Sequence, residues 1–95
     1  MSWINLGEVY DVVHREVDPE EGEATVALLR PLVTLDLPTP ETVMAAARIK
    51  AQHPLAYAGA FAVATAIAHD AVLLTGDPEI VRRDLGCAVE DLSRV

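Results

Sequence analysis

The longest apolar run of the sequence, residues 56–68, most strongly limits what this chain can fold into. The run lies within the segment AYAGAFAVATAIAHD and is thirteen residues long. A membrane-spanning helix needs roughly 18–20 apolar residues, so we interpret the run as a buried helix of a globular domain. Its alanines at 58, 62 and 66, and at 60, 64 and 68, give smooth faces that neighbouring elements can approach closely.

Three short segments give start signals for further helices. Each places a capping Asp or Thr before a proline at the first helical position, with a glutamate in the first turn: DPEE at 18–21, TPET at 39–42 and DPEI at 77–80. Together with the hydrophobic spacing and the later prolines, these signals predict helices at 6–17, 19–30, 40–52 and 55–69, and a short one in the C-terminal tail.

Strands are predicted between these helices, at residues 1–5, 32–37 and 71–76, with an edge strand near 87–89. The segment AVLLTG at 71–76 is continuously apolar, which is typical of a fully buried strand. Alternating strands and helices predict an α/β fold with a parallel sheet. Ligands bind at the carboxyl ends of such strands. Glu8 follows the first predicted strand and Asp77 follows 71–76, so two carboxylates are expected at one edge.

Charge and cysteine content narrow the functional class. Fifteen acidic residues against seven basic ones give a net charge of −8, which argues against a basic surface that follows nucleic-acid phosphates. A cation held by carboxylates could still attract nucleic acid locally.

A single cysteine, Cys87, excludes an internal disulfide and has no nearby base to activate it. With no signal-peptide pattern at the N-terminus, we expect a cytoplasmic protein with no membrane partner.

Two segments, SWINLGEVY and AARIKAQHPLAYAGAFAVATAIAHDAVLLTGDPEI, resemble the PIN-domain family, and more closely the VapC-type toxins of bacterial toxin–antitoxin pairs. The resemblance covers residues 1 to about 90. It implies a three-layer α/β/α fold with a parallel sheet, and a metal-dependent endoribonuclease acting on RNA. In the family, three or four carboxylates gather one or two Mg²⁺ or Mn²⁺ ions, which suits phosphodiester hydrolysis because hard cations take oxygen ligands and activate water.

The family's site residues carry over only in part. Glu8 matches the helix glutamate, Asp77 matches the acid of the TGD motif, and Thr75 matches the hydroxyl residue before it. The resemblance therefore implies Glu8 and Asp77 as metal ligands, with Thr75 beside them in the catalytic set. Gly59 stands where the family has the acid of a YADAF-like segment, and the family's first acid, in a segment like LDTSAL, has no counterpart. We therefore expect one truncated PIN-like domain, residues 1–95, that lacks the family's first strand.

Each of these residues also has a purely structural explanation. Glycine inside a helix costs about 1 kcal/mol relative to alanine, so Gly59 marks either a lost metal ligand or a close approach by another element. Asp77 can serve as a helix cap, and Glu8 as a first-turn glutamate that the helix dipole favours. Thr75 at a strand end can bond to backbone groups.

Two functions remain open from the sequence. The first is a VapC-like endoribonuclease that is impaired because two of four carboxylates are absent. The second is a non-catalytic module that binds an antitoxin-like protein or its own copy; in a third arrangement, another chain would complete the site. Loss of the first strand would leave exposed sheet edges. We therefore expect a homo-oligomer, unless the strands at 1–5 and 71–76 pair directly or the chain is part of a longer protein.

Overall fold

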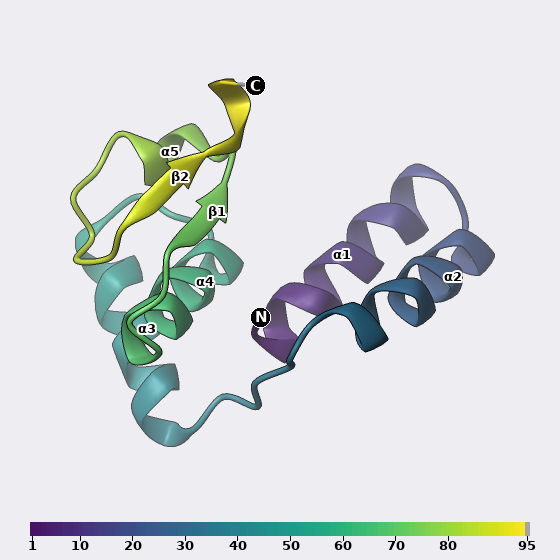
Figure 1. Ribbon diagram of the computed structural model, residues 1–95, viewed down its shortest axis with the longest axis horizontal. Helices are drawn as coiled ribbons and strands as arrows, with labels where there is room; N and C mark the ends of the chain where they lie inside the picture. The colour runs from purple at the N-terminus through teal and green to yellow at the C-terminus, as the bar shows by residue number, and fades with distance from the viewer. Residues whose placement is uncertain (95) are drawn as a thin grey trace. The chain divides into compact units, whose positions relative to one another are not determined.

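The computed structural model describes residues 1–94, which form two compact units, Met1–Pro38 and residues 39–94. Each unit has its own helices and its own backbone pairing (Figure 1). None of the helices in this described part of the chain has the length and apolar character that crossing a bilayer requires.

The first unit is a hairpin of two helices. Helix α1 (Trp3–Glu16) begins after Ser2, whose Oγ accepts the N–H of Ile4 at 3.2 Å. Helix α2 (Pro19–Leu29) begins after Asp18, whose Oδ1 accepts the N–H of Glu21 at 2.8 Å, and it continues into the short 3-10 helix η1 (Arg30–Leu32). Both caps satisfy backbone donors that the first turn of a helix leaves unpaired.

The two helices of the hairpin pack closely around few buried side chains. Leu6 of α1 is 2% exposed, and Gly22 is the buried residue of α2. A Cβ added at Gly22 would lie only 3.1 Å from the Tyr10 ring, so the absence of a side chain there lets α2 approach α1. Outside this contact, the Arg30 guanidinium lies over the Trp3 ring at 5.1 Å from its centroid, a cation–π geometry.

The predictions of strands at residues 1–5 and 32–37 were wrong. Helix α1 already starts at Trp3, and the two segments meet only in an isolated parallel bridge between Ser2 and Asp36. Two backbone bonds hold that bridge: Asp36 N–H donates to Met1 O at 2.8 Å, and Trp3 N–H donates to Asp36 O at 3.0 Å. The helical spacing that includes Leu6 extends back to Trp3. Helix α1 therefore includes residues 3–5, and too few residues precede it to form a ladder with another strand.

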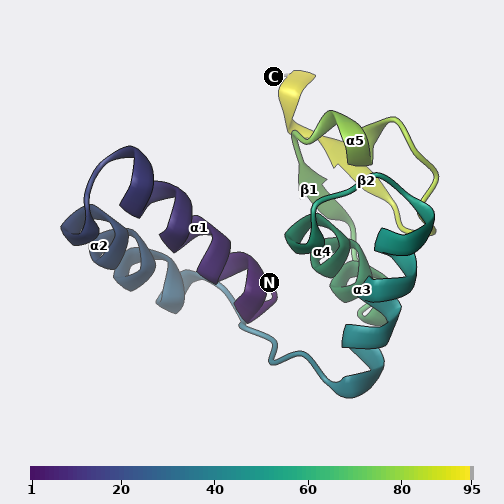
Figure 2. The same ribbon diagram turned by 180° about the vertical axis from the view of Figure 1, so that it is seen from behind.

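The second unit contains two long helices, a small sheet and short C-terminal elements. In chain order they are α3 (Pro40–Gln52), α4 (Tyr57–Ala68), β1 (Leu73–Thr75), α5 (Pro78–Val81), β2 (Val89–Asp91) and the 3-10 helix η2 (Leu92–Arg94). Helix α4 packs against α3 and also contacts β1, as the two opposite views show (Figures 1 and 2). The two long helices of this unit therefore exist with bounds within two residues of those expected, whereas α1 begins three residues before its predicted start.

The core of this unit is centred on α4, as its apolar sequence predicts. Its alanines allow α3 to approach, and one cluster of buried residues joins the two helices: Ala46, Ala60, Phe61 and Ala64. A second cluster joins α4 to α5 and the loops that flank them: Leu55, Val63, Ile80 and Leu85. Val63 is fully buried, and burial of such a side chain is worth about 1.5–3 kcal/mol.

The sheet of the second unit is parallel, as predicted, but small. Strand β1 pairs with β2 in a register that places Leu73 opposite Val89 and Thr75 opposite Asp91. These two strands are the whole sheet within residues 1–94. The prediction of a fully buried strand at 71–76 was wrong, because Leu74 is 58% exposed where the sheet has no covering layer. The expected α/β class, helices with a parallel sheet, is confirmed.

Helix α4 ends in a backbone conformation that is unusual for the residue present. Asp70 has φ of 49°, and its N–H donates to Ile67 O at 3.1 Å while Ala71 N–H donates to Ala66 O at 2.9 Å. This bonding pattern is a Schellman motif, in which the left-handed position is usually glycine. The aspartate therefore bears a conformational cost so that the chain can leave α4 and enter β1.

Candidate functional site

The candidate site lies at the carboxyl end of β1, where the TGD motif leaves the sheet. Thr75 is the last residue of β1, and its Oγ1 accepts the N–H of Asp77 at 3.1 Å. Asp77 in turn caps α5, because its Oδ1 accepts the N–H of Glu79 at 2.9 Å. The structural explanations of Thr75 and Asp77 are therefore both confirmed: a backbone bond and a helix cap hold the turn in place.

The second carboxylate oxygen of Asp77 lies beside Gly59 of α4. A Cβ added at Gly59 would be 3.9 Å from Asp77 Oδ2 and 3.6 Å from Ile80 Cδ1. Both distances are ordinary van der Waals contacts, so a side chain could be added without displacing either neighbour. Close packing therefore does not require glycine here. A carboxylate attached at position 59 would instead lie next to Asp77, at the edge where parallel sheets bind ligands.

The nearby acids on α5 and the following loop are engaged elsewhere. Glu79 Oε2 accepts from Arg83 Nη2 at 3.0 Å, and its Oε1 lies 3.8 Å from Arg82 Nη1. Asp84 Oδ1 accepts the N–H of Gly86 at 3.2 Å. Both carboxylates are therefore engaged in these contacts, and neither adds a metal ligand to the site at Asp77.

Asp91 is an acid at this edge that the sequence interpretation missed. It pairs in register with Thr75, at the carboxyl end of β2. Its Oδ1 accepts both the N–H and the hydroxyl of Ser93, which fixes the start of η2. The signal available in the sequence was the VED segment, since an acid at the end of a second parallel strand must lie at the same sheet edge as the first.

Glu8 does not lie at the end of a strand, contrary to the prediction. It is an exposed residue of α1, which belongs to the unit Met1–Pro38, whereas Thr75, Asp77 and Gly59 all belong to the other unit. The structure thus brings Thr75, Asp77 and Gly59 together at one point. The role of Glu8 as a ligand stays a prediction.

The side chains present do not form a cage for a metal ion. Within residues 1–94, no group of three or more His, Cys, Asp or Glu side chains could hold one. Mg²⁺ prefers near-octahedral oxygen coordination, usually with more than one carboxylate or phosphate. Asp77 uses one of its oxygens as a helix cap and keeps Oδ2 open toward Gly59. The donor set on this unit is therefore too small for a firmly held cation.

The single thiol of the chain has the properties of an inert group. Cys87 is half-buried and packs against the cluster of Leu55, Val63 and Ile80. Burial raises the pKa of the Cys87 thiol, and the charge of Asp84 raises it further. The reactive thiolate is therefore scarce at neutral pH, which agrees with the prediction that Cys87 is not a nucleophile.

Comparison with known proteins gives one match. The family model described as the PIN domain matches residues 1–85, a range that contains Glu8, Gly59, Thr75 and Asp77. A comparison with curated proteins gave no match, and a comparison with solved structures gave none either. Since the matched residues make up most of the chain, the protein belongs to the PIN domain family.

Proposed function

We propose that this PIN domain protein is a VapC-like endoribonuclease of a toxin–antitoxin pair whose active site is incomplete, because Gly59 supplies no carboxylate beside Asp77. PIN domains are generally nucleases that depend on divalent metal ions, so family membership indicates nuclease-type chemistry. The VapC assignment and the RNA substrate rest on the resemblance of the INLGEVY and LLTGDPE segments. The proposed cytoplasmic location rests on the single cysteine and the N-terminal sequence.

The observation that carries the proposal is the position of Gly59. A Cβ added at Gly59 would lie 3.9 Å from Asp77 Oδ2, which is an ordinary van der Waals contact. Gly59 lies in the first turn of α4, and no neighbour requires a glycine there. Such a glycine is what replacement of a functional carboxylate leaves behind. The open oxygen of Asp77 faces the position from which that carboxylate would have come.

The remaining groups at the edge have positioning roles in this account. Thr75 fixes the backbone of the TGD turn, and the cap to Glu79 N–H fixes the Asp77 carboxylate. Both bonds hold Asp77 Oδ2 where a ligand of a hydrolytic site would be needed. We assign Glu8 as the second carboxylate of the site by resemblance. We also propose that the two units act as one PIN domain, since the family match extends across their boundary.

Restoration of the carboxylate tests the proposal. Purified wild-type chain and the Gly59→Asp variant are incubated with a fluorescent single-stranded RNA in Mn²⁺, with and without EDTA. We expect little cleavage by the wild type and a gain by Gly59→Asp that EDTA abolishes. Gly59→Asn is the matched control, because it has nearly the same size without the charge, and it should not gain activity.

The choice of knock-out variant matters for this test. Asp77→Ala removes the α5 cap as well as the carboxylate, whereas asparagine is also a good N-cap residue. Asp77→Asn in the Gly59→Asp background should therefore remove the gained activity without the structural loss. Wild-type cleavage that is lost with EDTA and in Asp77→Asn would contradict the proposal, since the residues already present would then suffice.

A second candidate function is a non-catalytic interaction module that binds an antitoxin-like protein. The observation that favours it is the exposure of large apolar side chains on the first unit, including Leu28 at 67% and Leu32 at 71%. Scattered exposed apolar residues are normal, but contiguous ones mark interaction sites, and Leu28 at the end of α2 is four residues from Leu32 at the end of η1. This function needs neither Asp77 nor a metal, so an inactive Gly59→Asp variant would favour it.

A further inference from the structure

The end of the α1–α2 hairpin opposite its turn carries an arginine held against an aromatic ring. The Arg30 guanidinium lies 5.1 Å from the centroid of the Trp3 ring, and we call these two side chains the Arg30–Trp3 platform. Hydrogen bonds fix the backbone of both residues. Trp3 N–H donates to Asp36 O at 3.0 Å, and Arg30 N–H donates to Val26 O. The platform is therefore arranged before any ligand binds, which lowers the ordering cost of binding.

The guanidinium of the platform has binding capacity that the protein does not use. Arg30 is exposed, and among residues 1–94 its side chain interacts only with the Trp3 ring. A guanidinium has five N–H donors in one plane. Its face stacks on aromatic rings and its edge donates to carboxylate or phosphate oxygens. The outer face and the edge are therefore both available to a ligand that combines an aromatic ring with an anionic oxygen.

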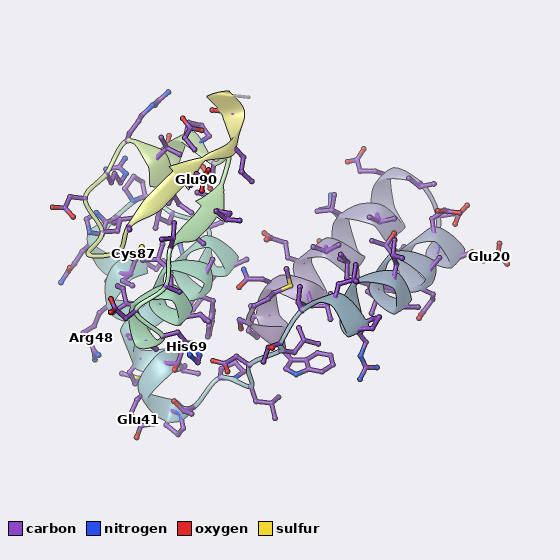
Figure 3. The ribbon with its side chains drawn as sticks, in the orientation of Figure 1. Glu20, Glu41, Arg48, His69, Cys87 and Glu90 are labelled. Carbon is purple, nitrogen blue, oxygen red and sulfur yellow. The ribbon has the colours of Figure 1, made fainter. Side chains whose placement is uncertain are left out.

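The charge pattern of the hairpin favours an anion at the platform end over the turn end. Residues 1–38 contain eight acidic residues and two arginines. Five of the acids surround the turn: Glu16, Asp18, Glu20, Glu21 and Glu23. Glu20 extends outward at that end (Figure 3). Arg15 pairs with Asp11 at 3.1 Å, whereas Arg30 has no ion pair in the described part of the chain.

The platform end is not strongly positive, however. Asp36 lies there too, because its backbone bridges to Ser2. A ligand attracted by charge alone would therefore bind weakly, and stacking on the platform must supply most of the affinity.

A nucleotide of single-stranded RNA has the chemistry that the platform matches. Unpaired bases stack on aromatic side chains and on arginine planes, and a phosphate oxygen accepts strong hydrogen bonds from a guanidinium edge. We propose that the Arg30–Trp3 platform binds one unpaired nucleotide, with its base on the outer face of the guanidinium and a phosphate oxygen at the edge. The inference rests on the RNA substrate of the proposed function, and it adds substrate-binding residues to the unit that does not contain Asp77.

Fluorescence of Trp3 reports on the platform directly, because Trp3 is the single tryptophan of the chain. The full-length wild type is titrated with hexaadenylate RNA in EDTA, and the anisotropy of fluorescein-labelled hexaadenylate measures the same binding. We expect saturable quenching of Trp3 and one Kd from both signals. Arg30→Lys keeps the charge and removes the planar face, and Arg30→Gln removes both. Each variant should raise the Kd on the order of tenfold, as loss of base stacking does.

Controls separate base stacking from a general effect of charge. Arg15→Gln changes the net charge as Arg30→Gln does but removes only the pair with Asp11, so it should leave the Kd unchanged. Inorganic polyphosphate, which is anionic without bases, should not displace the RNA. Absence of quenching, an unchanged Kd in Arg30→Lys, or displacement by polyphosphate would each overturn the proposal.

The binding measurement is independent of the nuclease test, because EDTA prevents metal-dependent cleavage. Absence of Trp3 quenching in a chain whose Gly59→Asp variant cleaves RNA would overturn the platform alone. Binding that depends on Arg30, together with an inactive Gly59→Asp variant, would support the platform and count against the nuclease.

Discussion

Replacement of Gly59 by alanine should stabilise the protein, because the position has room for a side chain that helix formation favours. The added Cβ would lie 3.6 Å from Ile80 Cδ1 and 3.9 Å from Asp77 Oδ2, so it displaces nothing. In a helix interior alanine exceeds glycine in propensity by about 1 kcal/mol, partly through the lower entropy of the unfolded chain. Gly59 lies in the first turn of α4, so this value is the upper bound of the expected gain. For a unit of this size, a gain of that magnitude raises the Tm by roughly 4–8 °C.

Urea unfolding and thermal melting followed by circular dichroism would measure the gain. Two other glycines serve as controls. Gly7 in α1 has nothing within 4 Å of its missing Cβ, so Gly7→Ala should also stabilise by about 1 kcal/mol. Gly22 has the Tyr10 ring at 3.1 Å, so Gly22→Ala should leave stability unchanged or lower it by up to about 2 kcal/mol, as overpacking does.

A loss of stability in Gly59→Ala comparable with that of Gly22→Ala would contradict this expectation. Glycine at 59 would then be required by packing, and the explanation of a lost carboxylate would lose its support. A gain would show that stability did not select glycine at this position.

Four further results are expected. Gly59→Asp in the absence of a metal should be less stable than Gly59→Ala by between about 1 and 3 kcal/mol, because its carboxylate would lie beside that of Asp77 and like charges repel. Urea unfolding should show Mn²⁺ removing this difference, and a metal-independent difference would contradict the geometry at Asp77. Asp77→Ala should lower the free energy of unfolding by about 1 kcal/mol through loss of the α5 cap, while Asp77→Asn should not; equal losses in the two variants would mean that the cap to Glu79 N–H contributes little. Asp70→Gly should stabilise by about 1 kcal/mol, since φ of 49° costs an ordinary residue about that much, and an unchanged urea midpoint would count against this. Cys87 should react with a disulfide reagent at pH 8 more slowly in the native chain than in urea. Because the pKa of the Cys87 thiol is raised in the folded state, the free energy of unfolding should fall as pH rises from the ordinary thiol pKa toward the raised one. Equal labelling rates in the native chain and in urea would contradict both statements.

The helices were predictable because their signals are local. Ser2 was overlooked, but the caps at Asp18, Thr39 and Asp77 each formed the expected side-chain bond to the first turn. Such a bond depends only on residues within one turn of the helix, so the sequence contains all that is needed. The prediction of a parallel sheet succeeded for a similar reason, because the segment between β1 and β2 is long enough for a crossover connection.

The strands were less predictable because a strand depends on distant partners. Residues 32–37 have β-branched and leucine residues but meet only Ser2, through the bridge to Asp36. Residues 1–5 have a helix-compatible spacing that continues into α1, and the capping bond of Ser2 to Ile4 decides the competition. The apolar segment 71–76 predicts that Leu74 is buried. The exposure of Leu74 depends on how many layers cover the sheet, which no short segment specifies.

The candidate site was predictable in part. The TGD motif located Thr75 and Asp77, and the helix propensity of glycine drew attention to Gly59. The sequence does not show that Gly59 and Asp77 are neighbours, because α4 and the end of β1 meet through tertiary packing. Asp91 was missed because its importance depends on its register with Thr75, and register is fixed by pairing between segments separated along the chain.

A direct metal titration tests whether position 59 is the vacant ligand position beside Asp77. Electron paramagnetic resonance measures free Mn²⁺ as wild type, Gly59→Asp and Gly59→Asn are added at increasing concentration. We expect Gly59→Asp to bind one Mn²⁺ at least on the order of tenfold more tightly than the other two chains, since a second carboxylate joins Asp77. Equal affinities in all three chains would contradict it.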